Sequence, residues 1–245
     1  MKSNYHQNIH IMDLFPGKQE IQIIANQLRN QNCVIIKNFL DHEYCNNVIS
    51  YLSNVRLNSL PRYEPMRTSS PNNYRLNHED QRSNVQGFFE QFNFFNHNQD
   101  LMHIFIRLNK IFELKDSLSY ELADKKTFFR SMNPPENFIS RVGFQFYPSE
   151  RGYLEEHSDY VGENQYVVPT LVLSKRGRDY FDGGFYYKTK TNHIVDPEPF
   201  LDIGDIILFD PRLPHGVSRV KKHGHYDWRS AEGRWMAFAT TTKTT

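Results

Sequence analysis

The chain has 245 residues, of which 38% are hydrophobic, 14% aromatic and 23% charged, a composition typical of one large globular domain rather than of a disordered chain. The formal net charge of +1 at pH 7 excludes the strongly basic balance that favours nucleic acid or an anionic membrane surface. We therefore expect neither of these as a partner.

The two cysteines, Cys33 and Cys45, are too few for a disulfide scaffold, and their surroundings are typical of buried thiols. The first residues contain no apolar core of signal-peptide type, and no run approaches the roughly 18–20 apolar residues of a membrane span. Together these features predict a protein of the reducing cytoplasm.

The first part of the chain predicts helices around one strand. Residues 1–15 are polar and predict an arm. Apolar residues spaced as on one helical face predict a helix that begins near Gln19, and an apolar run at 33–36 predicts a short buried strand. A second helix follows with Asp41 as its N-cap, and the pattern over 101–118 predicts a third helix.

Residues 56–84 show neither a helical nor a strand period of apolar residues, and arginines are mixed there with prolines and asparagines. A long irregular segment inside a compact domain is often a lid or a binding loop, although a solvated surface excursion has the same composition. The next stretch, 88–95, is aromatic and its pattern assigns no element. The arginines of 56–84 favour an anionic or carboxylated substrate; they are Arg62, Arg67, Arg75 and Arg82.

From about residue 138 the pattern is that of strands separated by turns. Val142, Phe144 and Phe146 alternate with Gly143, Gln145 and Tyr147, so that this strand has two distinct faces. About eight short strands at this spacing predict a jelly roll or a related barrel. Helices followed by strands indicate helices packed outside a β core. The other predicted strands lie near 153–159, 169–174, 185–187, 206–209, 215–219 and 234–239.

Two histidines and one aspartate form the candidate metal site. In an extended strand His157 and Asp159 point to the same side, and His215, after the turn at Pro211, is the natural third ligand. Two imidazoles and one carboxylate on one side of a metal are the arrangement used for non-haem iron(II), with open positions for oxygen and a co-substrate. A His-x-Asp triplet alone is weak support, since the chain has 11 histidines.

With these residues the sequence resembles the iron(II)/2-oxoglutarate-dependent dioxygenases, especially their prolyl-hydroxylase-like and phytanoyl-hydroxylase-like branches. The resemblance implies a single domain, 1–245, that is mainly β with flanking helices. Its core, 138–240, would be a double-stranded β-helix (jelly roll, cupin-like), and 1–137 would be mostly helical with 56–84 as a lid-like loop. The matching segments are His157-Ser158-Asp159, Asp182-Gly183-Gly184, Gly204-Asp205, Pro214-His215-Gly216-Val217 and Gly233-Arg234-Trp235, with the opening near 20–54.

The resemblance also implies roles for single residues. His157, Asp159 and His215 would hold iron(II) and form the catalytic centre. Arg234 would bind the far carboxylate of 2-oxoglutarate, because a guanidinium binds a carboxylate through two hydrogen bonds. It lies farther beyond His215 than is usual in the family, which requires a looped-out polar insert, and Arg219 and Arg229 are its rivals.

Three further side chains are candidates for the 2-oxoglutarate site. The family often uses a tyrosine at the position of Tyr147 to hydrogen-bond 2-oxoglutarate, although a packed core tyrosine fits the same pattern. Gln145 shares its strand face, and Thr170 is a weaker candidate for the same role.

The activity implied is hydroxylation of an unactivated C–H bond of a small molecule, an amino acid or a natural-product intermediate, with release of succinate and CO2. Fe(II), 2-oxoglutarate and O2 are the implied cofactors, with ascorbate as a further candidate. Asp159 disfavours halogenation, and Thr240 stands where nucleic-acid demethylases carry a second arginine. The alternatives are a protein or peptide side-chain hydroxylase and a non-catalytic cupin-type metal- or ligand-binding protein.

Overall fold

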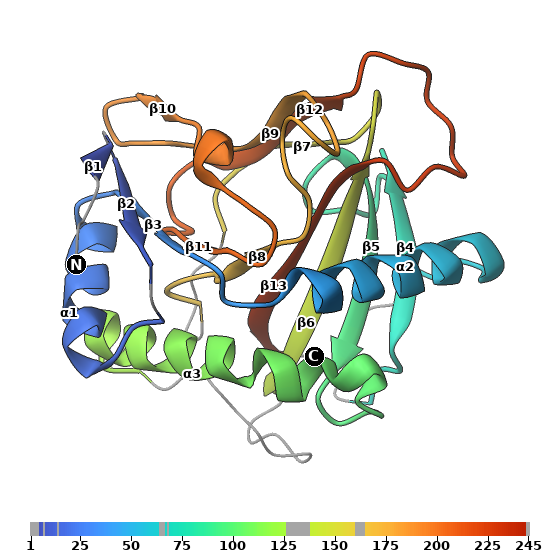
Figure 1. Ribbon diagram of the computed structural model, residues 1–245. Coiled ribbons are helices and arrows are strands. Elements are labelled where there is room, and N and C mark those ends of the chain that lie inside the picture. The colour runs from blue at the N-terminus through green and yellow to red at the C-terminus, as the bar shows by residue number, and fades with distance from the viewer. Residues whose placement is uncertain are drawn as a thin grey trace.

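The computed structural model describes residues 5–6, 8–13, 15–63, 67, 69–125, 138–159 and 165–243 (Figure 1). Its core is built from the eight strands of the C-terminal half, all paired antiparallel. In chain order they are β6 (Phe138–Pro148), β7 (Tyr153–His157), β8 (Thr170–Val172), β9 (Asp182–Lys188), β10 (Ile194–Val195), β11 (Ile206–Leu208), β12 (His215–Lys221) and β13 (Gly233–Lys243).

These eight strands wind between two halves of one curved sheet. One half has the order β11-β8-β13-β6 and the other has the order β7-β12-β9-β10, so that the chain crosses repeatedly from one half to the other. This alternation is a double-stranded β-helix, which confirms the predicted core. Side chains from both halves, among them Tyr147, Val217 and Met236, pack together between them.

Strand β5 (Gly87–Phe95) joins the two halves, because it pairs with β6 along most of its length and with β7 at its start. All nine of its residues are buried, which explains why no alternation was visible in the aromatic stretch. Strand β4 (Asn73–His78) pairs with the other edge of β5. The segment 56–84, predicted as irregular, therefore contains a strand, and residues 64–66 and 68 lie outside the described residues.

The prediction of a polar arm over residues 1–15 is wrong. Strand β2 (Ile9–Met12) runs parallel to β3 (Cys33–Ile36), which in turn pairs with β11 of the core, while β1 (Tyr5–His6) pairs with β2. The side chains of Ile9 and Met12 are buried there. Strand β2 has only four residues, one of them polar, so its sequence pattern is too short to predict a strand. Its pairing with β3 determines the structure instead.

The helices cover the outer face of the sheet half that contains β13 and β6 (Figure 1). The Asp41 carboxylate accepts a hydrogen bond from the Tyr44 amide at 2.7 Å, which confirms the predicted N-cap. The described residues of 1–137 thus combine helices with five strands. The helical segments of the described chain are α1 (Lys18–Arg29), α2 (His42–Asn58), η1 (Leu101–His103), α3 (Ile104–Ala123) and η3 (Glu198–Phe200).

Cys33 and Cys45 are both free and buried, as predicted. Burial raises the pKa of each thiol to about 12. We therefore expect almost no thiolate at pH 8, so that a thiol reagent such as Ellman's reagent reacts with neither cysteine in the native protein and with both in urea. Rapid reaction of one cysteine in the native state would contradict this burial.

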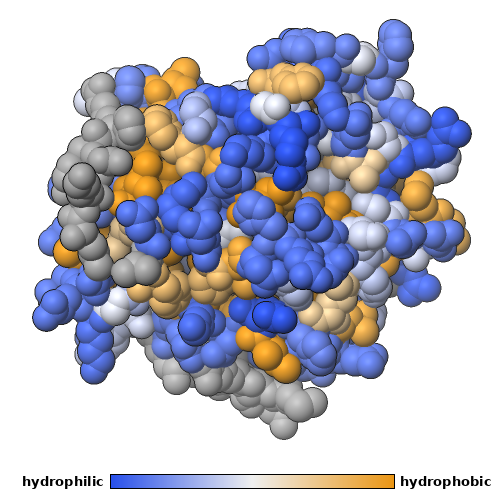
Figure 2. Space-filling view, viewed as in Figure 1, coloured by the Kyte–Doolittle hydropathy of each residue, from blue (hydrophilic) through white to orange (hydrophobic). Residues whose placement is uncertain are grey.

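The face of the molecule seen in Figure 2 is mixed in polarity. Figure 2 shows hydrophilic residues over most of one face, with apolar residues in small separate groups. In the part of the chain that the structure describes, every helix is too short or too polar to cross a bilayer.

Candidate metal centre and its cavity

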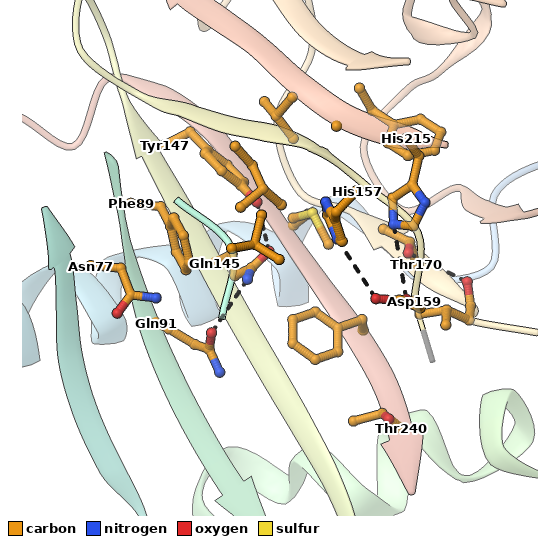
Figure 3. Close-up of a pocket in the computed structure, with 18 of the residues that line it drawn as sticks. Asn77, Phe89, Gln91, Gln145, Tyr147, His157, Asp159, Thr170, His215 and Thr240 are labelled. Carbon is orange, nitrogen blue, oxygen red and sulfur yellow. Dashed lines mark hydrogen bonds and ion pairs between the residues drawn. The ribbon is translucent and has the colours of Figure 1, made fainter. Parts of the chain in front are cut away.

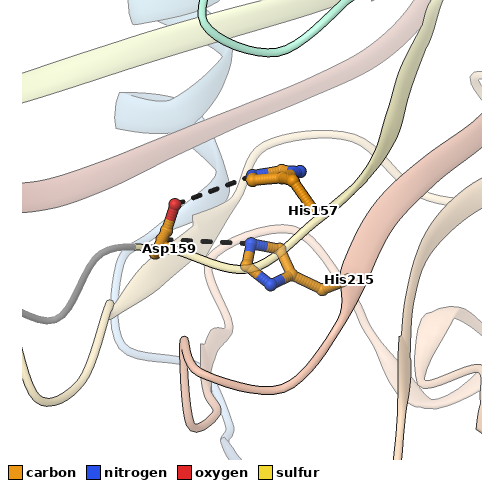
Figure 4. A group of neighbouring side chains, drawn as sticks. All are labelled: His157, Asp159 and His215. Atoms are coloured by element: carbon orange, nitrogen blue, oxygen red, sulfur yellow. Dashed lines mark ion pairs between the residues drawn. The ribbon is translucent and has the colours of Figure 1, made fainter.

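Three predicted ligands meet where β7 ends and β12 begins. His157 is the last residue of β7, and it lies directly opposite His215, the first residue of β12. Asp159 follows just beyond β7, where its amide donates to the Pro211 carbonyl at 2.9 Å. One nitrogen or oxygen atom from each of the three side chains lies within 4.8 Å of the other two (Figure 4).

The ring of each histidine is held by a backbone carbonyl. Nδ1 of His157 lies 2.9 Å from the Glu155 oxygen, and Nδ1 of His215 lies 2.8 Å from the Leu213 oxygen. If Nδ1–H donates to these carbonyls, the lone pair of each neutral ring is on Nε2. The two Nε2 atoms lie 3.6 and 3.9 Å from the oxygens of Asp159, so both lone pairs face the carboxylate. This is how ligand histidines are commonly oriented.

Burial and mutual contacts set the charges of the centre. Burial, together with the neighbouring His157, lowers the pKa of His215. Burial also opposes the charged forms of His157 and Asp159, but the attraction between these two side chains and the contacts with their other neighbours together outweigh it, raising the pKa of His157 and lowering that of Asp159. Near neutral pH the site therefore holds an ionised carboxylate beside a neutral His215, as metal ligation requires.

The centre forms part of the wall of a cavity of about 440 Å³, within the size range of small-molecule sites. Tyr147, Gln145 and Thr170, the predicted neighbours of 2-oxoglutarate, all line this cavity (Figure 3). The Tyr147 hydroxyl donates to Gln145 Oε1 at 2.7 Å, and Gln145 Nε2 donates to Gln91 at 3.3 Å. Thr170 only reaches the Val168 carbonyl, at 3.5 Å.

Arg234 is not among the residues that line this cavity. Its side chain is almost fully buried, and its Nε donates to Glu198 Oε1 at 2.7 Å. Tyr180 also donates to Glu198, and the Arg234 guanidinium carbon lies 6.0 Å from the Tyr147 ring centre. Burial opposes the charge of Arg234, but Glu198 outweighs it and raises its pKa. Sequence reasoning did not predict that Glu198 is the partner of Arg234, because the two residues are far apart along the chain.

The two rival arginines lie elsewhere. Arg219 is exposed and stacks over Tyr153, with its guanidinium carbon 5.0 Å from the ring centre. Arg229 is exposed and pairs with Asp227 at 3.1 Å. Like Arg234, neither lines the cavity, but both are exposed to solvent whereas Arg234 is buried.

Sequence reasoning also missed Arg141, which lines the cavity from β6. The alternation over 142–147 could have indicated it. Arg141 lies on the same strand face as Gly143, Gln145 and Tyr147, two residues before Gly143. Part of the wall is aromatic and includes Phe89, Phe209 and Phe238, in keeping with the high aromatic content of the chain.

No protein-family model and no curated protein matches this sequence. Solved structures do match its fold. A prolyl-4-hydroxylase from Pseudomonas putida is 12% identical with a TM-score of 0.54, covering 92% of this chain and 100% of its own. A Trichoplax adhaerens prolyl hydroxylase, in complex with a peptide of a hypoxia inducible factor, is 15% identical with a TM-score of 0.54, covering 92% and 90%.

A full-length protein from Neurospora crassa, solved in complex with alpha-KG and thymine, is 10% identical with a TM-score of 0.56, covering 98% of this chain and 88% of its own. At these identities the likeness concerns the fold. The chain therefore has the jelly-roll fold found in these oxygenases.

Proposed function

We propose that this protein is an iron(II)- and 2-oxoglutarate-dependent oxygenase that hydroxylates a C–H bond of a small molecule. The observation that carries the proposal is the convergence of His157, Asp159 and His215 at the wall of a cavity of about 440 Å³. The likeness in fold to the prolyl hydroxylases and to the Neurospora crassa protein supports it.

The donor set fits iron(II). Two imidazole nitrogens and one carboxylate, with both Nδ1 atoms engaged by carbonyls, form the facial triad of non-haem iron sites. His157, Asp159 and His215 would hold the metal, and Asp159 would offset part of its charge. Bound there with 2-oxoglutarate, iron(II) would supply the oxidation of the substrate by O2, with succinate and CO2 as further products.

The surroundings of Arg234 fit the far carboxylate of 2-oxoglutarate. Its Nη1 is buried and has no hydrogen-bond partner among the described residues, while Nε is held by Glu198. A guanidinium fixed on one side by a carboxylate keeps donors on its other side for a ligand. Tyr147 lies between this guanidinium and the cavity, and its hydroxyl would turn from Gln145 to the co-substrate.

Aromatic side chains pack against His215 on one side of the centre. The rings of Phe209 and Phe185 lie 4.9 and 6.3 Å from the His215 ring, centre to centre. Such walls orient an apolar part of a substrate and strengthen the electrostatic interactions inside the site. The protein would thus contribute position and exclusion of water.

The proposal is tested by incubating the protein with iron(II), 2-oxoglutarate and ascorbate under air and measuring succinate. We expect slow succinate release without substrate, none after removal of iron with a chelator, and none with zinc in place of iron. Iron binding without any succinate, with or without added small molecules, would favour the cupin-type binder. Faster turnover with peptides only would favour the peptide hydroxylase.

Replacement of Arg234 by methionine should raise the KM for 2-oxoglutarate by about ten- to a hundredfold, the range expected for lost hydrogen bonds to a charged group. Because Arg234→Met alone leaves the buried Glu198 unpaired, the double variant Arg234→Met/Glu198→Gln should be measured beside it. The matched control is the exposed Arg219→Met, which should leave this KM unchanged. If Arg219→Met raised the KM for 2-oxoglutarate more than Arg234→Met does, Arg234 would not be the residue that binds 2-oxoglutarate.

A further inference from the structure

Two arginines face the cavity without an acidic partner. Arg141 on β6 is 9% exposed and Arg75 on β4 is half-buried, and both line the cavity that contains the metal centre. Within the described part of the chain, neither forms an ion pair with a carboxylate. Buried arginines elsewhere in this protein do have such partners, as Arg234 has Glu198.

The hydrogen bonds of the two guanidiniums leave donors unused. Arg141 Nη1 donates to Asn93 Oδ1 at 2.6 Å, and Arg75 Nη2 donates to Gln91 Oε1 at 3.2 Å. Both acceptors are neutral amides. The Nε atom of each arginine is buried and has no hydrogen-bond partner among the described residues. A buried charge without a counter-charge is costly unless a ligand supplies one.

Aromatic rings hold both guanidiniums in place. Arg141 stacks on Phe238 with its guanidinium carbon 5.2 Å from the ring centre, and Arg75 lies 5.4 Å from the ring centre of Tyr63. The Phe238 ring lies directly over Gly143, where an added Cβ would come within 2.3 Å of it. The absence of a side chain at Gly143 therefore leaves room for the tip of the Phe238 ring, on which Arg141 lies.

The two charges also repel each other. Burial, with Arg75 as the next contribution, lowers the pKa of Arg141 to about 9, and burial lowers the pKa of Arg75 as well. An anion bound between them would relieve both effects. Arg75, Arg141 and Asp159 line the same cavity, so the pair shares this cavity with the candidate metal centre.

We propose that Arg75 and Arg141 together bind the carboxylate group of the substrate. This inference rests on the proposed oxygenase function of the adjoining centre. Asp159 is the one carboxylate among the described residues that line the cavity, and it belongs to that centre. Among the described residues of the wall, a substrate ammonium group would meet two guanidiniums and no acid outside that centre. The substrate class is therefore a carboxylic acid without a free amino group, with an apolar part directed at the aromatic wall.

The test uses an acid and its matched neutral amide, 3-phenylpropionate and 3-phenylpropionamide, as probes. The full chain is first titrated with Mn(II) and 2-oxoglutarate in a calorimeter, and the probes are then titrated into the loaded protein. We expect the acid to bind at least about tenfold more tightly than the amide. Arg75→Gln and Arg141→Gln should each reduce that preference by about tenfold, because the new amide keeps a hydrogen-bonding group but loses the charge.

Arg178→Gln is the matched control, since Arg178 is an exposed arginine that pairs with Asp179 at 2.9 Å and does not line the cavity. It should leave the preference unchanged. The inference is overturned if the acid does not bind or binds no more tightly than the amide. It is also overturned if Arg75→Gln and Arg141→Gln weaken 2-oxoglutarate instead, because the pair would then serve the co-substrate. Failure of Mn(II) to bind in the first titration would instead count against the metal centre.

A structural role of the pair predicts a different result. If the two arginines only supported the fold, their glutamine variants would unfold at lower temperature than the parent protein. Relief of repulsion predicts an unchanged or higher unfolding temperature without ligand, and a smaller rise on addition of 3-phenylpropionate.

Discussion

Replacement of Asp159 by alanine is expected to abolish iron-dependent succinate formation and to weaken iron binding at least about a hundredfold, more than loss of a supporting contact to a ligand. The reason is that Asp159 supplies the one anionic donor, and both Nε2 atoms of the centre face it within 3.6 and 3.9 Å. Iron binding is measured by competition with a coloured chelator, and succinate by its release.

The fold should survive this change. Without a metal, the Asp159 carboxylate interacts with His157, His215 and Gln165 at a partly exposed part of the cavity wall, so the unfolding temperature of Asp159→Ala should stay within a few degrees of the parent. His223→Ala is the control, because His223 lies in an exposed loop and pairs with Asp182 at 3.3 Å. Undiminished iron-dependent turnover by Asp159→Ala would remove the basis of the proposed function.

Replacement of Glu90 by glutamine is expected to lower the free energy of unfolding by about 3–5 kcal/mol, because it leaves the Arg56 charge buried without a partner. Arg56 on α2 donates to Glu90 on β5 through Nε at 2.9 Å and Nη2 at 2.5 Å. Tyr74 donates to the same carboxylate at 2.7 Å. Glu90, outweighing the opposing effect of burial, raises the pKa of Arg56.

Urea denaturation measures this loss. The exposed pair Arg178–Asp179 supplies the control, and Arg178→Met should leave the free energy of unfolding almost unchanged. The double variant Arg56→Met/Glu90→Met should be more stable than Glu90→Gln, since no buried charge remains. A loss for Glu90→Gln no larger than that of the control would mean that the buried pair does not stabilise α2 on the sheet.

The metal centre could be predicted from sequence because its geometry is local. His157 and Asp159 are two residues apart, and the turn at Pro211 returns the chain to the same edge of the sheet at His215. Strand β7 ends at His157 rather than continuing through Asp159, yet the two side chains still face each other. The spacing of strands and turns after residue 138 similarly predicted a jelly roll or a related barrel, and the structure has a double-stranded β-helix there.

The remaining features depend on contacts between distant segments. Nothing near Arg234 indicates that Glu198, from the short helix η3, occupies its Nε. Strand β2 is stabilised by its hydrogen bonds to β3, and β4 is stabilised by its hydrogen bonds to β5. The local sequence pattern does not indicate which segments pair. For this reason residues 1–15 were wrongly predicted as an arm, and the strand within 56–84 was not predicted.

The β4–β5 hairpin carries Arg75, Gln91 and Phe89 to the cavity, whereas His157, Asp159 and His215 come from the β-helix itself. Under the proposed function, the hairpin therefore supplies only part of substrate recognition, through Arg75, because Arg141 lies on β6 of the same core as the proposed iron ligands. Exchange of residues 73–95 for the corresponding hairpin of another protein with this fold offers a route to altered selectivity that leaves the iron ligands in place. In evolution, the same arrangement would let the hairpin diversify while the oxidative machinery stayed constant.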